Sequence, residues 1–141
     1  MESSPACWAA YGEVLAREYS DPAYFAVHRL SVDAYAVQHP GKPSPQTIQS
    51  VAVHLIRLCL LLERGLPMER ANDAMLAASE REEGFVWLTP PASRGAVTVA
   101  DVKDASDVEE HLRQVRAWAD SAWQAWHSHY ATIRSWLPAG Y

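Results

Sequence analysis

The chain has few cysteines and lacks the short motifs that identify several common chemistries. Its 141 residues include two cysteines, Cys7 and Cys59, and six glycines that are scattered singly. Two separated cysteines build neither a disulfide framework nor a zinc ribbon, and isolated glycines form no phosphate-binding loop. The Gly-x-Ser-x-Gly nucleophile turn and the His-Glu-x-x-His zinc motif are also missing. These absences argue against the nucleotide-binding, serine-hydrolase and zincin classes that such motifs identify.

The chain also lacks an excess of positive charge and a long apolar run. Twelve Lys and Arg stand against 17 Asp and Glu, a net charge of −5, which disfavours binding to a nucleic-acid backbone. The most apolar stretch, residues 51–62, contains His54 and Arg57 and is shorter than the roughly 20 residues of a membrane-spanning helix. The first residues do not resemble a signal peptide. We therefore expect a cytoplasmic protein with no nucleic-acid and no membrane partner.

What the sequence does contain is a series of amphipathic helices. A length of 141 residues with 49% hydrophobic residues suits one domain, residues 1–141, with its own core. Capping residues followed by proline, at Asp21-Pro22 and Ser44-Pro45, indicate helix starts. Apolar residues at spacings of three and four predict helices over about residues 5–19, 22–38, 45–64, 67–82 and 107–137.

Residues 85–99 do not follow the helical period. Phe85 to Leu88 and Val97 to Val99 are rich in β-prone residues, and two prolines and a glycine lie between them. We expect a short hairpin or two extended arms packed on the helices. The sequence thus predicts an all-α fold: a bundle of about five helices with a small β-prone insertion (about 85–99) before a long C-terminal helix.

Three of the six histidines, His28, His54 and His129, lie on different predicted helices, each on a face directed at the core. Neutral imidazoles from separate helices can hold a divalent metal ion of the zinc or nickel type and leave one position open for water. The leading hypothesis is therefore a metal-binding site inside the bundle. The alternative is that each ring hydrogen bonds to its own neighbour and is part of the structure. The sequence leaves open whether the protein is an enzyme.

Asp33 lies in an apolar part of its predicted helix, so a buried carboxylate there needs a partner. Two partners fit: an arginine, with Arg29 one turn earlier, or the histidine of another helix that the carboxylate would orient. Further residues predicted to support or line the site are Tyr35, His39, Trp126 and Tyr130.

The last predicted helix is crowded with tryptophans. Spacing of this kind is typical of a core, but with His129 and Tyr130 the indole rings would also suit the wall of a ligand pocket. The rival hypothesis is therefore a non-catalytic domain that binds a small-molecule ligand or a protein through this Trp-rich helix. A third hypothesis, a homo-oligomer, would require a broad exposed apolar patch. The tryptophans are Trp118, Trp123, Trp126 and Trp136.

The run Asp33-Ala34-Tyr35-Ala36-Val37-Gln38-His39-Pro40-Gly41 contains residues in an order that helix amphipathicity does not dictate. In this run, in residues 49–56 and in residues 118–136, the chain resembles the DUF5946 family of uncharacterised bacterial proteins. Many members carry a Cys-Pro-x-Cys-Gly element before the first helix, which this chain lacks, and Cys7 would be its one remaining ligand. The resemblance implies no reaction. It supports the choice of His28, Asp33, His39, His54 and His129.

Overall fold

The computed structural model describes residues 4–141, and prolines behind capping side chains set where several of its helices begin. Ser44 Oγ accepts the backbone N–H of Thr47, and the Thr47 hydroxyl accepts the N–H of Ser44 in return. In the same way, Ser4 and Asp21 cap the two earlier helices, which begin at Pro5 and Pro22. The α-helices are α1 (Pro5–Ser20), α2 (Pro22–Phe25), α3 (His28–Gln38), α4 (Pro45–Leu58), α5 (Met68–Ser79), α6 (Val99–Lys103), α7 (Val108–Ala125) and α8 (Tyr130–Ser135).

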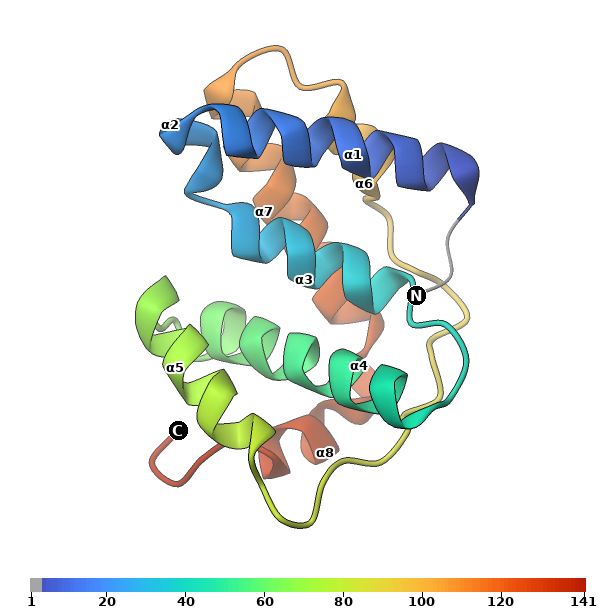
Figure 1. Cartoon of the computed structure of the whole chain (residues 1–141), viewed down its shortest axis with the longest axis vertical. Helices are drawn as coiled ribbons and strands as arrows, with labels where there is room; N and C mark the ends of the chain where they lie inside the picture. Colours follow the sequence, from blue (N-terminus) through green and yellow to red (C-terminus); the bar gives the residue numbers. More distant parts are fainter. Residues whose placement is uncertain (1–3) are drawn as a thin grey trace.

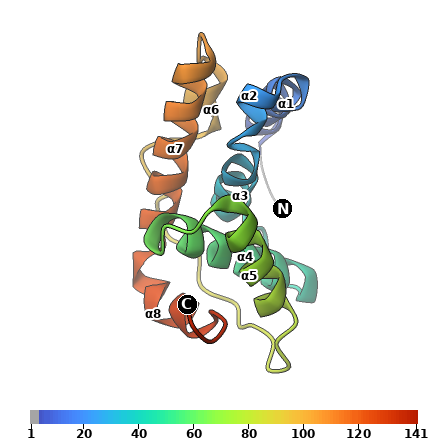
Figure 2. The ribbon, with the colours of Figure 1, turned by 90° about the vertical axis from the view of Figure 1, so that its left-hand side faces the viewer.

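Helices α1, α3 and α4 are stacked one above another, and α7 runs alongside this stack (Figures 1 and 2). Helix α3 is the middle layer and packs against both α4 and α7, while α6 covers α1 and α5 covers α4. Leu55 and Leu58 of α4, Val115 and Trp118 of α7 and Val14 of α1 are fully buried between these helices. The all-α fold predicted from the sequence is confirmed, and α3 is its central element.

Two of the predicted helices are interrupted. The helix expected over 22–38 bends at residues 26–27 into α2 and α3, and the long C-terminal helix ends at Trp126. A short 3-10 turn, His127–His129, then leads into α8. An unbroken helix of about thirty residues would extend roughly 45 Å, beyond the core. The break lets α8 turn back and pack on α4, with Ile133 buried there.

Of the two forms expected for residues 85–99, the hairpin is wrong, since residues 4–141 contain no strand, and Val99 begins helix α6. The segment before α6 is irregular because its backbone groups bond to side chains instead of to a second strand. The N–H of Val97 donates to Ser121 Oγ at 3.1 Å, and its carbonyl accepts from the Gln38 amide at 2.8 Å. Thr98 and Asp101 form a capping box at the start of α6, a helix that the sequence reading missed.

Helix α4 continues into a π-turn, Cys59–Glu63. Together they form one 19-residue helical stretch, Pro45–Glu63, that is long and apolar enough to cross a membrane by length and composition alone. This is weak evidence, because the core helix of a soluble protein passes the same test. Here the stretch packs against α3 and α5, with Leu55, Ile56 and Leu58 fully buried.

Candidate functional site

The three histidines predicted to share one metal ion lie apart in the structure. His28 Nδ1 donates to a carboxylate of α1 at 2.9 Å, and His54 Nδ1 donates to a carboxylate of α3 at 2.7 Å. His129 Nε2 donates to a backbone carbonyl of the irregular segment at 2.8 Å. In the described part of the chain, no group of three or more His, Cys, Asp or Glu side chains could hold a metal ion. The structure therefore does not assemble the predicted centre, because each ring is engaged by its own neighbour.

The partner of His28 is Glu18, a fully buried carboxylate that the sequence reading did not single out. Glu18 also accepts hydrogen bonds from Ser31 Oγ and from His111 Nε2. Arg17 donates to the other ring nitrogen of His111 at 3.1 Å, so the neutral ring carries its hydrogen on Nε2. Both carboxylate oxygens of Glu18 are thus occupied, and the cluster joins α1 to α3 and α7.

Asp33 has both kinds of partner considered from the sequence, an arginine and a histidine of another helix, but the arginine is not Arg29. Its buried carboxylate accepts from His54 Nδ1, and from Arg57 Nε and Nη2 at 2.9 and 2.7 Å. The arginine is Arg57 of α4, while Arg29 donates instead to Asn72 at 3.0 Å. Arg57 also reaches the Asn72 side chain, so this network joins α3, α4 and α5.

The aromatic residues expected to line a pocket are mostly part of the core. Trp126 is buried, and its indole N–H donates to the carbonyl of Val37 at 3.3 Å. Tyr130 stacks on Trp123 with ring centroids 4.3 Å apart and donates its hydroxyl to the Trp123 carbonyl. Tyr35 is fully buried and stacks on the ring of His39, 4.1 Å between centroids. The Trp-rich helix therefore serves mainly to pack α7 and α8 against the bundle.

His39, which follows the last residue of α3, differs from His111, the other buried histidine. Its side chain is only 3% exposed, and its Nδ1 lies 2.9 Å from the backbone carbonyl of Tyr35. Because a carbonyl can only accept, the hydrogen is on Nδ1 and the neutral ring has a lone pair on Nε2. That nitrogen is buried and has no hydrogen-bond partner. Burial lowers the pKa of His39, and the positive charge of Arg94 lowers it further, against the hydrogen bond to Tyr35.

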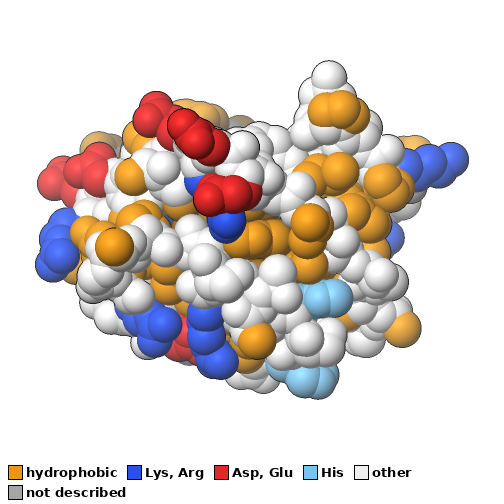
Figure 3. Space-filling model, turned by 90° about the horizontal axis from the view of Figure 1, so that it is seen from below, with side chains coloured by type: hydrophobic (Ala, Val, Ile, Leu, Met, Phe, Trp, Pro, Cys, Tyr) orange, Lys and Arg blue, Asp and Glu red, His pale blue; other side chains and the backbone are white. Residues whose placement is uncertain are grey.

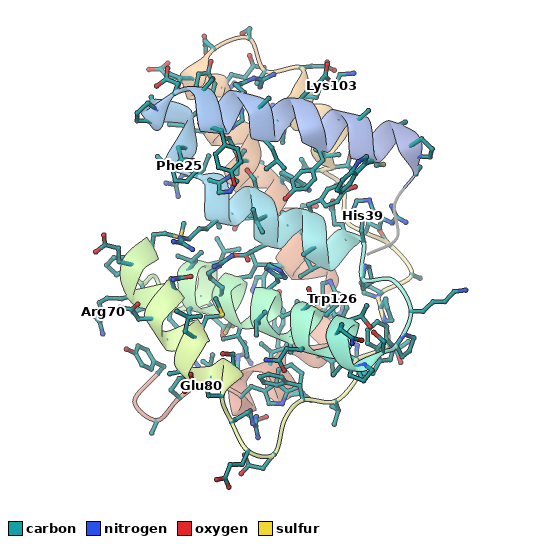
Figure 4. The ribbon with its side chains drawn as sticks, viewed as in Figure 1. Phe25, His39, Arg70, Glu80, Lys103 and Trp126 are labelled. Atoms are coloured by element: carbon teal, nitrogen blue, oxygen red, sulfur yellow. The ribbon has the colours of Figure 1, made fainter. Side chains whose placement is uncertain are left out.

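His39 lies at the end of α3 (Figure 4) and lines a cavity of about 310 Å³. Arg94 also lines this cavity, and its side chain is exposed. Its guanidinium forms no ion pair within the described residues. The cavity thus has a free cation and apolar surface in its lining, together with the ring of His39, whose Nε2 is closed off from solvent in this structure. Its lining residues are Val37, His39, Pro40, Gly41, Pro90, Pro91, Ala92 and Arg94.

Gln38 fixes the position of the segment that carries Arg94. Its side-chain carbonyl accepts the indole N–H of Trp118 at 2.7 Å, and its NH₂ donates to the carbonyls of Arg94 and Val97, both at 2.8 Å. All of its principal hydrogen-bonding groups are used, and the residue is 2% exposed. Gln38 therefore holds the Arg94 backbone against α3, one residue before His39.

A protein-family model described as a family of unknown function, DUF5946, matches residues 1–127. The chain belongs to the DUF5946 family. No curated protein and no solved structure matches it. In this DUF5946 protein the run that carried the resemblance, residues 33–41, builds one wall of the cavity. The same run contains Asp33, which binds Arg57 of α4, and Gln38, which donates to the backbone carbonyl of Arg94.

Sequence reasoning named His39 but missed Arg94 and Gln38. Arg94 lies in an irregular segment far along the chain, and no periodicity or motif links it to His39. The one available signal was Gln38 itself, a polar residue at an inward position directly before His-Pro-Gly.

The large hydrophobic side chains that stay exposed lie on several different elements. On the face in Figure 3, hydrophobic side chains gather over the centre and right of the view, with most of the charged side chains toward the left and the edges. The exposed residues are Trp8, Tyr19, Phe25, Leu76, Val86 and Tyr141.

Proposed function

We propose that this DUF5946 protein binds a small organic acid in the cavity between His39 and Arg94. The observation that carries the proposal is a cavity whose lining includes an unpaired arginine and His39, a residue with a buried lone pair on Nε2 that no donor reaches. Leaving a buried acceptor unsatisfied costs about 1–3 kcal/mol. A ligand that supplies an O–H or N–H removes this cost when it binds.

Each part of the cavity has a role in this proposal. The guanidinium of Arg94 offers parallel N–H donors to a carboxylate, which is the geometry it matches best. Pro40, Pro90 and Pro91 provide rigid apolar walls for the carbon skeleton. His39 accepts a hydrogen bond from a donor on the ligand. About half of the surface that lines this cavity is polar, and small-molecule sites combine apolar walls with fixed polar groups.

The small-ligand hypothesis derived from the sequence is kept, but its place moves from the Trp-rich helix to the end of α3. The divalent-ion hypothesis asks His28, His54 and His129 to meet at one point, whereas each ring has a separate partner. The small-ligand hypothesis requires only that His39 offers a lone pair to the ligand. Binding is the function that this geometry supports, and no reaction is assigned to it.

Isothermal titration calorimetry with benzoate tests the contact with Arg94, and nitrobenzene is the matched ligand because its nitro group has the shape of a carboxylate but no net charge and no hydrogen-bond donor. Benzoate is expected to bind saturably, and more tightly than nitrobenzene by about tenfold or more, which corresponds to roughly 1.4 kcal/mol. The Arg94→Gln variant should lose that difference. Arg113→Gln, which removes the same charge from an exposed position on α7, is the control. Equal affinities for both ligands, or an unchanged affinity in Arg94→Gln, would contradict the proposal.

A further inference from the structure

A second cavity of about 160 Å³ lies on the other side of His39. We propose that the ligand spans both cavities and is an N-acyl amino acid, with its carboxylate at Arg94, its amide N–H at His39 and its acyl tail in the second cavity. This inference rests on the proposed function. The second cavity is lined by Ala36, His39, Pro40, Gln46, Thr47, Ser50 and Val51.

The two cavities share only His39 and Pro40 among their lining residues. His39 and Pro40 therefore form the boundary between the two cavities, and a ligand that occupies both has to pass over this boundary. The part of the ligand that meets the ring has to be a donor, because Nδ1 is held by the Tyr35 carbonyl and Nε2 offers a lone pair. In this structure Nε2 is closed off from solvent, so the wall has to shift slightly for the ligand to reach it.

An amide N–H suits this position better than a second charged group. It is a donor at every physiological pH, and in an N-acyl amino acid it lies one carbon from the carboxylate. An ammonium donor would add a positive charge close to Arg94. A neutral amide donor adds none, and the carboxylate next to it remains free for the guanidinium.

The second cavity suits an acyl tail. Ala36, Pro40 and Val51 present apolar surface, while the hydroxyl of Ser50 and the side chain of Gln46 have no hydrogen-bond partner within the described residues. Thr47 is already engaged by the cap of α4. Ser50 and Gln46 are thus available to the acyl carbonyl, and the apolar surface to the chain beyond it.

Three ligands that differ by one feature test the inference on the wild-type protein. N-hexanoylglycine carries all three parts, N-acetylglycine lacks the tail, and O-hexanoylglycolate has an ester oxygen in place of the N–H. By calorimetry, N-hexanoylglycine is expected to bind about tenfold tighter than either of the others. Equal binding of the amide and the ester would overturn the role given to His39.

Blocking the second cavity separates this inference from the proposed function. Ser50→Leu should remove the gain from the longer chain and leave benzoate binding unchanged, while Ser128→Leu, at an exposed position, should change neither. If benzoate binds to the wild type but the hexanoyl chain brings no gain, the spanning ligand is wrong and the proposed function stands. If no acid binds to the wild type, both fail.

Discussion

At the scale of single residues, the buried polar side chains of this protein are of two kinds. Glu18, Asp33 and Gln38 have partners for their principal hydrogen-bonding atoms and join one helix to another. His39 has one occupied nitrogen and one that is buried without a partner. Native proteins satisfy nearly all buried polar groups, so the exception is a better guide to a site than the satisfied residues are.

Replacing Asp33 with asparagine tests how much the buried polar side chains with partners contribute to stability. The Asp33→Asn variant leaves the guanidinium of Arg57 buried without a negative partner, and breaking a buried pair in this way costs about 3–5 kcal/mol. Urea unfolding of the variant should show a loss of that size. Asp104→Asn, at an exposed position after α6, should stay within about 0.5 kcal/mol of the wild type. A loss below about 1 kcal/mol in Asp33→Asn would show that the network contributes little.

The lowered pKa of His39 predicts how stability depends on pH. As the pH falls through 6.5, the ordinary pKa of histidine, the unfolded chain takes up a proton at His39 while the folded chain does not. The free energy of unfolding should therefore decrease until the pH passes the lower pKa of the folded state. In His39→Phe the decrease between about pH 7 and about pH 5.5 should be smaller than in the wild type.

Two acidic groups with shifted pKa values, Glu63 and Glu110, do not titrate in this range. Hydrogen bonds from Arg134 lower the pKa of Glu63, and hydrogen bonds from Ser106 lower that of Glu110, so both act below the ordinary value of 4.5. Denaturant titrations at the two pH values provide the measurement. An identical pH dependence in wild type and His39→Phe would mean that His39 is not held neutral by the fold.

At the scale of helices and loops, the sequence predicts where a helix begins better than where it ends. The caps at Ser44 and Asp107 are local, and both begin the expected helices. At the break, the indole N–H of Trp126 donates to the carbonyl of Val37 in α3, a contact between distant residues that no local pattern contains. The hairpin that was one of the two forms expected for residues 85–99 does not form, because the backbone of Val97 bonds to side chains of α3 and α7.

Gly95 shows how tightly the Arg94 segment is held against α7. Its φ is +103°, and a Cβ there would lie 2.5 Å from Ser121 Oγ and 2.8 Å from the Ser121 carbonyl oxygen. Gly95→Ala should therefore destabilise the protein by about 1–3 kcal/mol from the clash, in addition to the backbone strain. The segment should shift as well, weakening benzoate binding.

Gly84 provides the matched control for Gly95. Its φ is also positive, at +65°, but a Cβ there would meet nothing within 4 Å. Gly84→Ala should show only the backbone strain, about 1–2 kcal/mol, with benzoate binding unchanged. Thermal unfolding and calorimetry of the two variants give the comparison, and equal losses would contradict the close packing of Gly95 on Ser121.

At the scale of the whole molecule, one stack of helices brings together residues that are far apart in sequence. The all-α class and His39 follow from periodicity and from the run at 33–41. The position of Arg94 beside the same cavity does not follow from the sequence pattern. It depends on the hydrogen bond from Gln38 to the Arg94 carbonyl and on the packing of residues 94–97 against α7. Likewise, helical faces placed three histidines toward the core, but only the packing decides that each meets a different partner.

A benzoate titration of ¹⁵N-labelled protein, followed by its backbone amide signals, tests the central claim most directly. We predict saturable shifts concentrated at Gly41, Ala92 and Arg94, around the cavity, and their loss in Arg94→Gln. Shifts scattered over the surface, shifts centred on the Trp-rich helix, or shifts that persist unchanged in Arg94→Gln would contradict the account.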